Sequence, residues 1–170
     1  QVGAEVSEEL PPALVLCGGY GTRLRSELAP GQPKALAYVN GVPFIQRLLE
    51  HLRNRGFKHC VMCVGYGARD MVEWSKGWNG YSRVNVFNID HPPQDTFLTV
   101  KGARVLVEKE RDFFVINGDT FCDLNYQEML ESHFEEKALA TVAVNDSYQS
   151  VGATILNHEV FNFVKGTERK

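Results

Sequence analysis

A continuous apolar run that stops at two glycines constrains this chain most. The run covers residues 13–17, and Gly18 and Gly19 follow it directly. Apolar residues at every position, instead of every second one, predict a strand that is buried on both faces of a parallel sheet. The chain has 170 residues, of which 44% are hydrophobic, and this is enough to bury one substantial core. We expect a short polar leader at 1–12 and one domain at 13–170.

The same pattern of apolar segments continues along the chain. Further strands are predicted at 60–64, 84–89, 113–116, 139–144 and 151–156. Apolar residues at helical spacing predict helices at 43–55, with Gly56 as its C-cap, through Val100, Ala103 and Val107, at 125–134 and at 159–164. Alternating strands and helices predict an α/β fold, a Rossmann-like three-layer sandwich with a mostly parallel, mixed central sheet. Such sheets bind ligands at the carboxyl ends of their strands.

Composition excludes several classes of partner. Charged residues make up 23% of the chain and the net charge is −3, so neither an acidic tail nor a basic nucleic-acid surface is indicated. No apolar run approaches the roughly 18 to 20 residues that cross a bilayer, and the N-terminus lacks a signal-peptide pattern. We expect a cytoplasmic, soluble protein with reduced cysteines and no nucleic-acid or membrane partner. A homo-oligomer is compatible with the sequence.

The segment CGGYGTRL, residues 17–24, follows the first predicted strand. The backbone N–H groups of Gly18, Gly19 and Gly21 can approach phosphate oxygens because no side chain intervenes, and Arg23 adds a forked cation. The segment is neither a Walker loop, because GK[ST] is absent, nor the dinucleotide-binding fingerprint. A glycine-rich turn with a purely structural role is the alternative.

A carboxylate follows the strand predicted at 113–116, in the sequence Asn117-Gly118-Asp119. At the carboxyl end of a parallel strand, Asp119 faces the same crevice as the glycines, where it can hold Mg²⁺ against phosphates. An ordinary turn residue is the alternative interpretation. Asp123 is interpreted as a helix-start residue that caps free N–H groups, with a second metal ligand as the alternative. Asn117 and Thr120 are candidates for shaping the site.

GGYGTRL followed by Pro33-Lys34 resembles the signature of the sugar-1-phosphate nucleotidylyltransferases. This resemblance implies an enzyme that joins an NTP and a sugar 1-phosphate and releases pyrophosphate, with Mg²⁺ as cofactor. It assigns catalytic roles to Arg23 and Lys34, which hold the triphosphate, and metal binding to Asp119. The residues that it assigns to nucleotide binding are Leu16, Cys17, Gly18, Gly19, Gly21, Thr22, Arg23, Lys34, Thr96 and Gly118. The chemistry agrees, because attack on an α-phosphate builds negative charge that fixed cations stabilise.

Two segments bear on the nucleotide base. Residues 33–52 and 116–126 look closest to bacterial guanylyltransferases acting on heptose 1-phosphate, which favours GTP with a heptose or mannose-type sugar. In residues 91–99, by contrast, only Thr96 fits the glycine-rich stretch with which the family contacts the base or ribose. Asp95-Thr96, Thr99 and residues 102–104 resemble hexose-1-phosphate cytidylyltransferases, so CTP stays open. From other classes, a non-catalytic domain that binds nucleotide sugars is the main alternative, and a nicotinamide-dependent oxidoreductase is a distant one.

One departure from the family concerns the sugar. The family has a sugar-phosphate lysine in an E-K-P segment, which we expect between residues 144 and 151, and the sequence NDSYQS stands there instead. We infer that residues have been lost at this point, that the C-terminal part of the domain is incomplete, and that the second metal-binding aspartate is missing with the lysine.

Cysteine and histidine patterns indicate no further site. Cys60 and Cys63 have a CxxC spacing, but residues three apart in a strand point to opposite faces, so we expect core positions instead of a zinc or redox centre. The five histidines show no ligand spacing and are interpreted as surface or packing residues. They are His51, His59, His91, His133 and His158.

Overall fold

The computed structural model describes residues 9–80, 83–88 and 96–163. Its main sheet has six strands in the order β5-β4-β1-β6-β8-β7. Their bounds are Ala13–Leu16 (β1), His59–Val64 (β4), Arg83–Asn88 (β5), Asp112–Asn117 (β6), Ala140–Val144 (β7) and Ser150–Asn157 (β8). Strands β5, β4, β1 and β6 are parallel, whereas β8 and β7 run antiparallel to β6 and to each other. The predicted α/β class with a mixed sheet is confirmed.

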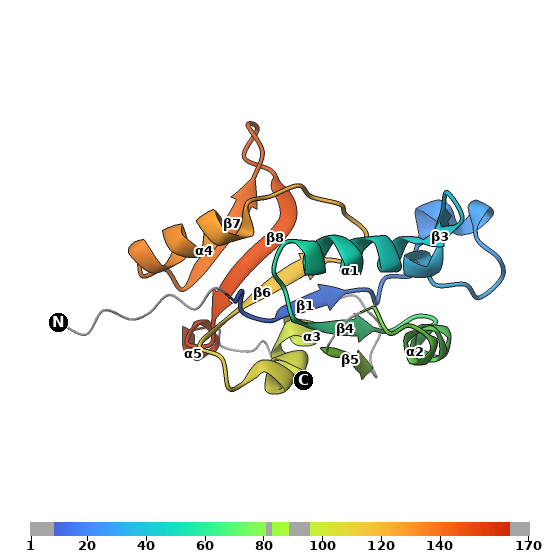
Figure 1. Ribbon diagram of the computed structural model, residues 1–170, viewed down its shortest axis with the longest axis horizontal. Coiled ribbons are helices and arrows are strands. Elements are labelled where there is room, and N and C mark those ends of the chain that lie inside the picture. Colours follow the sequence, from blue (N-terminus) through green and yellow to red (C-terminus); the bar gives the residue numbers. More distant parts are fainter. Residues whose placement is uncertain (1–8, 81–82, 89–95, 164–170) are drawn as a thin grey trace, which may run out of the picture.

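Helices cover both faces of this sheet (Figure 1). The helices whose apolar residues join the larger core cluster are α1 (Phe44–Asn54), α2 (Ala68–Gly77) and α4 (Tyr126–Glu135). The elements on the smaller cluster are α3 (Thr96–Ala103), the 3₁₀ turn η3 (Arg104–Val107) and α5 (Val160–Phe163). Near the glycines lie two 3₁₀ turns, η1 (Thr22–Glu27) and η2 (Lys34–Leu36), and a small hairpin of β2 (Tyr38–Val39) and β3 (Val42–Pro43). Helix α2 was not predicted, and residue 164 of the predicted last helix lies outside the described residues.

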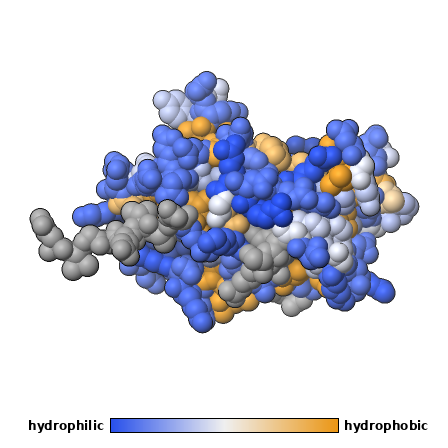
Figure 2. Space-filling view, viewed as in Figure 1, coloured by the Kyte–Doolittle hydropathy of each residue, from blue (hydrophilic) through white to orange (hydrophobic). Residues whose placement is uncertain are grey.

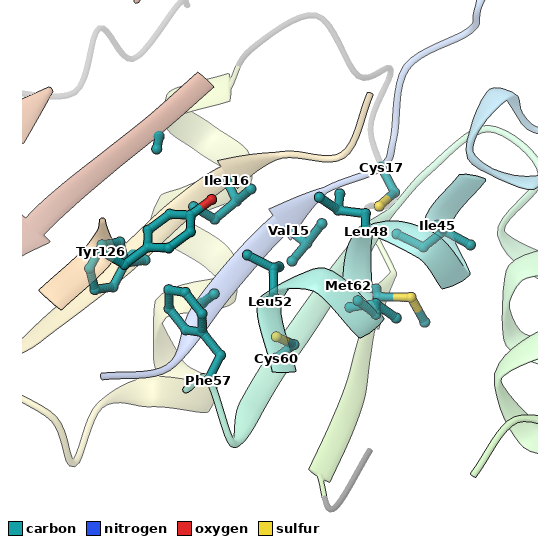
Figure 3. Packing of buried hydrophobic residues seen from close by; sticks show 14 of the residues in the cluster. Val15, Cys17, Ile45, Leu48, Leu52, Phe57, Cys60, Met62, Ile116 and Tyr126 are labelled. Carbon is teal, nitrogen blue, oxygen red and sulfur yellow. The ribbon is translucent and has the colours of Figure 1, made fainter. Parts of the chain in front are cut away.

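Helix α1 is the clearest case of sequence pattern becoming packing. Its buried residues, Ile45, Leu48, Leu49 and Leu52, recur at helical spacing on one face. Figure 3 shows this face against the sheet, where Val15 and Met62 belong to the same cluster. Gly56 follows the helix with φ 104°, a conformation that glycine adopts without strain. This agrees with the prediction of a glycine that ends the helix.

The two cysteines of the CxxC spacing lie on opposite faces of β4. Cys60 belongs to the cluster under α1, and Cys63 belongs to the cluster under α3. Both side chains are fully buried. The prediction that they occupy core positions on opposite faces is confirmed.

The packed part of the chain begins before residue 13. Leu10 is 5% exposed and forms an isolated bridge with Phe57. The carbonyl oxygen of Pro12 accepts a hydrogen bond from Phe114 N at 2.9 Å. Leu10 and Pro12, at the end of the expected leader, thus contact the folded domain. Residues 1–8 lie outside the described residues.

The connection between β7 and β8 is a closed hairpin turn. Asn145 N donates to Gln149 O at 3.0 Å, and Tyr148 N donates to Asn145 O at 2.9 Å. The Asn145 side chain also accepts from Ser147 N and Gln149 N, each at 3.0 Å. Val144 pairs with Ser150 directly beyond this turn. Residues 145–149 thus complete a hydrogen-bonded turn between paired strands at the point where the family's E-K-P segment was expected.

Asp123 does not cap the following helix. The N-cap of α4 is Asn125, whose side-chain oxygen accepts from Glu128 N at 3.2 Å. Asp123 instead forms an ion pair with Arg55 at the end of α1. The predicted helix at 125–134 starts one residue before α4, because it counts the capping residue Asn125 as helical.

The surface is mostly polar on the face shown in Figure 2, where hydrophobic residues appear as separate areas. The large apolar side chains of the sheet lie beneath the helices instead. Among the helices of the described ranges, none has the length and apolar character that a membrane crossing requires.

Candidate functional site

Loops after three parallel strands meet at the carboxyl edge of the sheet. They enclose a cavity of about 210 Å³. Its lining residues are Leu16, Cys17, Gly18, Gly19, Lys34, Ala35, Cys63, Thr96, Thr99, Asn117, Gly118 and Asp119. An adjoining pocket shares Lys34 and Asp119 with it and is otherwise lined by Gly21, Thr22, Arg23 and Leu24. The structure thus brings every sequence-predicted site residue to one of these two neighbouring hollows.

Glycine is required at position 118 by close packing. A Cβ atom there would lie 2.5 Å from the carbonyl oxygen of Leu16 and 2.7 Å from Cys17 Sγ. The amide of Gly118 donates to that same carbonyl oxygen at 3.0 Å, which continues the β1–β6 pairing beyond the strand. Gly118 therefore lets the chain stay against β1 while Asp119 turns toward the cavity.

The glycine loop leaves open space on its cavity side. A Cβ atom at Gly19 would meet nothing within 4 Å, so a ligand can approach the backbone closely. Gly21 has φ 62°, and from there the chain enters η1, which carries the exposed side chain of Arg23. A Cβ at Gly21 would also lie 3.0 Å from Lys34 Cβ, so this loop and the Lys34 segment are in contact.

The Lys34 segment is supported from the other side by the loop after β4. Gly67 has φ 68°, and a Cβ atom there would lie 2.8 Å from Pro33. A hydrogen bond from Leu36 N to Pro33 O at 3.0 Å closes the turn that contains Lys34. Ala35, the residue after Lys34, is buried. The backbone of Lys34 is therefore held between two glycine-containing loops, and its side chain extends to Asp119.

Lys34 and Asp119 form the central contact of the site. Lys34 Nζ donates to Asp119 Oδ2 at 2.5 Å, and the Thr120 hydroxyl donates to Asp119 Oδ1 at 3.1 Å. Partial burial acts to raise the pKa of Asp119. The hydrogen bond and charge of Lys34, with the Thr120 hydroxyl, outweigh burial and hold this pKa below its usual value. Asp119 is therefore ionised at neutral pH.

The two cysteines of the cavity are not nucleophiles. Burial, with smaller contributions from neighbouring groups, raises the pKa of Cys17, and burial raises the pKa of Cys63 to about 12. Both thiols are therefore protonated at neutral pH, whereas the reactive form of cysteine is the thiolate. They shape the floor of the cavity.

Sequence reasoning did not assign Ala35, Cys63, Thr99 or Asn117 to the site, although it considered Asn117. Thr99 is 7% exposed and lies one helical turn after Thr96 on α3, so both threonines face the cavity. Helical spacing applied to polar residues would have found it. Residues 91–95 of the stretch compared with the family lie outside the described residues.

The donor set fits a magnesium ion held together with phosphates. Asp119 presents carboxylate oxygens at the junction of the two pockets. Among the described residues, no group of three or more His, Cys, Asp or Glu side chains is arranged to hold a metal. Mg²⁺ is commonly bound by one or two carboxylates, substrate phosphates and waters, instead of an all-protein cage. The residues present therefore suit a metal that arrives with a phosphate ligand.

The fold and this site define an α/β domain with a cavity at the carboxyl edge of its sheet, and comparison with known proteins assigns its family. Residues 12–154 match the model of the family described as nucleotidyl transferase. The chain belongs to this family. The matched range contains the glycine loop, Lys34 and Asp119, so the family resemblance seen in the sequence is confirmed.

Individual relatives narrow the group. Mannose-1-phosphate guanyltransferase of Yarrowia lipolytica is 36% identical over 131 residues, which are 76% of this chain and 36% of the relative. D-glycero-alpha-D-manno-heptose 1-phosphate guanylyltransferase of Campylobacter jejuni is 31% identical over 135 residues, 79% of this chain and 58% of the relative. The chain thus spans between about a third and three fifths of the length of these relatives.

A solved structure agrees on the fold. The crystal structure of HddC from Yersinia pseudotuberculosis superposes with a TM-score of 0.76 at 23% identity. The match covers 92% of this chain and 81% of that one. The mixed sheet and its helices are therefore a fold that this chain shares with HddC.

Proposed function

We propose that the protein transfers a nucleotidyl group from an NTP, with GTP favoured, to a sugar 1-phosphate and releases pyrophosphate. The observation that carries the proposal is the meeting of the glycine loop, Lys34 and Asp119 at one cavity. Each is a group that a polyphosphate and its metal require, and Asp119 lies 85 residues from Lys34 in the chain. A structural glycine turn alone would not need the other two.

The two hollows suggest how a nucleotide lies. The inner cavity, with Leu16, Cys17 and the buried Thr99, takes the nucleoside, and the glycine backbone takes the phosphates at its mouth. The phosphate tail then passes Lys34 and extends toward Arg23 in the adjoining pocket. Backbone N–H groups and both cations meet the part of the ligand that carries the charge.

The reaction needs charge stabilisation more than proton transfer. A phosphate oxygen of the sugar phosphate attacks the α-phosphorus, and the bond between this phosphorus and the bridging oxygen breaks, so the bond electrons leave with pyrophosphate. Lys34 and Arg23 stabilise the negative charge that develops, and Asp119 would hold the Mg²⁺. When bound, the metal supplies further positive charge at the phosphate oxygens. No protein base is required, because the sugar phosphate is already an anionic nucleophile.

The preference for GTP rests on relatives. Both curated relatives described above are named for guanylyl transfer to a manno-configured sugar 1-phosphate. Their sequences are more than 30% identical to this chain over most of its length. We therefore favour a mannose or heptose 1-phosphate as acceptor.

A pyrophosphate-release screen tests the proposal. The full chain is incubated with Mg²⁺, each of the four NTPs and, in turn, mannose, heptose and glucose 1-phosphates. We expect release that is largest with GTP and a manno-configured sugar, and no release from the Asp119→Asn variant. Pyrophosphate release with CTP instead of GTP would identify the protein as a cytidylyltransferase. Nucleotide binding without release in any combination would identify a non-catalytic nucleotide-sugar-binding domain and contradict the proposal.

A further inference from the structure

The contact between Lys34 and Asp119 determines when this site can accept a metal. We infer that, in the nucleotide-free protein, the Lys34 ammonium group occupies the position on Asp119 that the metal would take. A nucleotide then draws Lys34 onto its phosphates and opens Asp119 to the metal. This inference rests on the proposed function, since it concerns the same site, but it adds a device that controls metal entry.

The geometry places the two occupants in competition. Lys34 Nζ lies 2.5 Å from Asp119 Oδ2, and a magnesium ion would bind that oxygen at about 2.0 to 2.1 Å. Two cations cannot share one oxygen at such distances without strong repulsion. The other oxygen, Oδ1, already accepts the Thr120 hydroxyl. Both oxygens of the carboxylate are thus engaged while Lys34 stays in place.

The absence of a larger cluster of ligating side chains among the described residues adds to this barrier. In the described ranges, Asp119 does not belong to any cluster of three or more metal-ligating side chains. One carboxylate that is already paired offers little to a divalent cation. A polyphosphate changes both conditions, because it brings further oxygens for the metal and a competing anion for Lys34.

The Lys34 ammonium group needs to move only a short way from Asp119 to reach a bound phosphate. Lys34 and Asp119 both line the inner cavity and the adjoining pocket, so a phosphate at this junction lies within reach of the ammonium group. The Lys34 side chain is 28% exposed and that of Asp119 is 45% exposed, so a ligand can reach both. Arg23 lines only the adjoining pocket of the two and, within the described residues, forms no ion pair with Asp119. It therefore serves as a matched cation for control.

Metal binding without nucleotide is the first test. Free Mn²⁺ is titrated against the full chain and followed by its paramagnetic resonance signal. We expect the Lys34→Gln variant to bind Mn²⁺ roughly five to ten times more tightly than the unsubstituted protein, because the competing ammonium group is gone. Arg23→Gln, which removes the same charge from the neighbouring pocket, should change the affinity less than about twofold. Equal affinities for the unsubstituted and Lys34→Gln proteins would overturn the inference.

Nucleotide binding without metal is the second test, and it uses a substitution of Asp119 in addition to Lys34→Gln. With EDTA present, Asp119→Asn should bind GTP about five to ten times more tightly, because Lys34 no longer has a carboxylate partner. In the Lys34→Gln background the same substitution should give a much smaller gain. Equal gains in both backgrounds would contradict the exchange of Lys34. If GTP binds to none of the proteins, the proposed function fails, and the Mn²⁺ titration still decides whether Lys34 blocks Asp119.

Discussion

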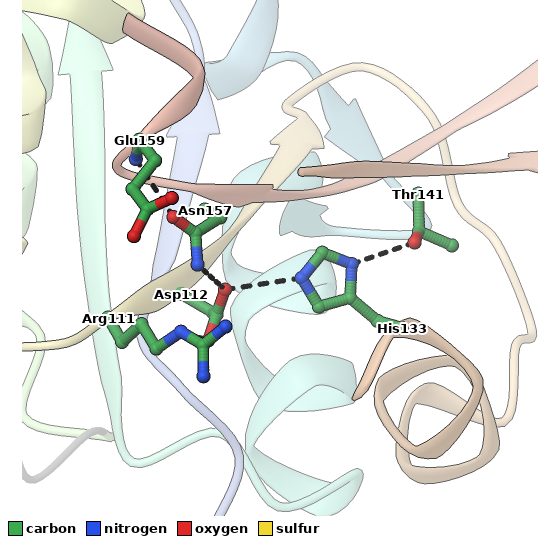
Figure 4. A network of polar contacts seen from close by, with 6 residues as sticks. All are labelled: Arg111, Asp112, His133, Thr141, Asn157 and Glu159. Atoms are coloured by element: carbon green, nitrogen blue, oxygen red, sulfur yellow. Dashed lines mark hydrogen bonds and ion pairs between the residues drawn. The ribbon is translucent and has the colours of Figure 1, made fainter. Parts of the chain in front are cut away.

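Strand β6 carries an aspartate near each end, and the two have opposite surroundings. Asp112, its first residue, is 4% exposed, and its Oδ1 accepts from Asn157 Nδ2 at 2.8 Å and His133 Nε2 at 3.2 Å (Figure 4). Asp119, two residues beyond the last, is 45% exposed and has Lys34 as its charged partner. Asp112 is buried, and its Oδ1 is held by side chains within the fold, with the exposed Arg111 3.7 Å from its Oδ2. It supports the fold, whereas the accessible Asp119 is held by a lysine that a ligand can reach and can exchange partners.

The contacts around Asp112 extend through several elements. His133 on α4 also contacts the Thr141 hydroxyl on β7 at 2.7 Å, and the Asn157 side chain accepts from Glu159 N at 2.8 Å. The network thus links α4, β6, β7 and β8 at the end of the sheet away from the cavity. Because its buried polar atoms are already paired, it has no donor or acceptor to offer a ligand.

Removing Asp112 should give the largest effect. We expect Asp112→Ala to lower the free energy of unfolding by about 3 to 5 kcal/mol, because it leaves buried donors of His133 and Asn157 without an acceptor. Urea unfolding followed by circular dichroism measures this change. Asp112→Asn is the matched control and should lose less, since its carbonyl oxygen can still accept. A loss below about 1 kcal/mol in Asp112→Ala would contradict a structural role for this network.

Substitutions at the opposite end should reduce turnover instead. We expect Lys34→Ala and Arg23→Ala each to lower kcat by on the order of a hundredfold, about 2.7 kcal/mol in the barrier, while unfolding stays nearly unchanged. Steady-state pyrophosphate release with the best substrate pair measures the change. Wild-type rates in both variants would remove these residues from the mechanism. A large loss of stability in either variant would show that these residues support the fold, as Asp112 does.

A substitution beside Asp119 should affect both properties. Gly118→Ala places a methyl group 2.5 Å from the Leu16 carbonyl oxygen, so the chain after β6 must shift. We expect a loss of roughly 1 to 3 kcal/mol in stability, together with reduced turnover from a displaced Asp119. Thermal unfolding and pyrophosphate release are measured on the same preparation. Gly19→Ala is the control, because a Cβ there meets no protein atom within 4 Å, and its stability should stay close to that of the unsubstituted protein.

The smallest effect concerns pH. Lys34 holds the pKa of Asp119 below its usual value, so the ion pair stabilises the folded state above the ordinary aspartate pKa and ceases to do so as the pH falls through the lowered one. We expect Asp119→Asn to melt slightly below the unsubstituted protein at pH 7, and the gap to narrow as the pH is lowered toward 3. Calorimetry at both pH values measures the difference. An undiminished gap at the lower pH would show that the ion pair is not its source.

The sequence was most informative where a motif and its element are contiguous. The sequence predicted strands β1, β4 and β6 and the buried face of α1. Each is marked by apolar residues within one short segment, so adjacent residues are enough to indicate its burial. Helix α2 was missed although Ala68, Met71 and Trp74 all pack against the larger core cluster, because only Met71 is buried and charged residues separate these positions. Asp112 was not considered, because its partners His133 and Asn157 are 21 and 45 residues away and no local pattern marks them.

The site shows the same limit in a different form. Lys34 and Asp119 were each predicted from local motifs, but they are 85 residues apart and their direct contact was not predicted. Motif recognition assigns residues to a site one at a time, and their pairing depends on the way the strands are ordered in the sheet. The turn between β7 and β8 has a local signal that the sequence reasoning did not use, because the Asn145 side chain accepts from two backbone N–H groups of the turn.

The packing of Pro33 against Gly67 sets the speed of the exchange that we propose. Since the backbone beside Lys34 is held by that contact and by Gly21, releasing Asp119 requires rotation of side-chain bonds without any loop opening. Rotamer changes of accessible side chains take picoseconds to nanoseconds, far faster than loop or domain motions. Metal entry would then follow nucleotide arrival without a kinetic delay, and a turnover limit must come from chemistry or product release.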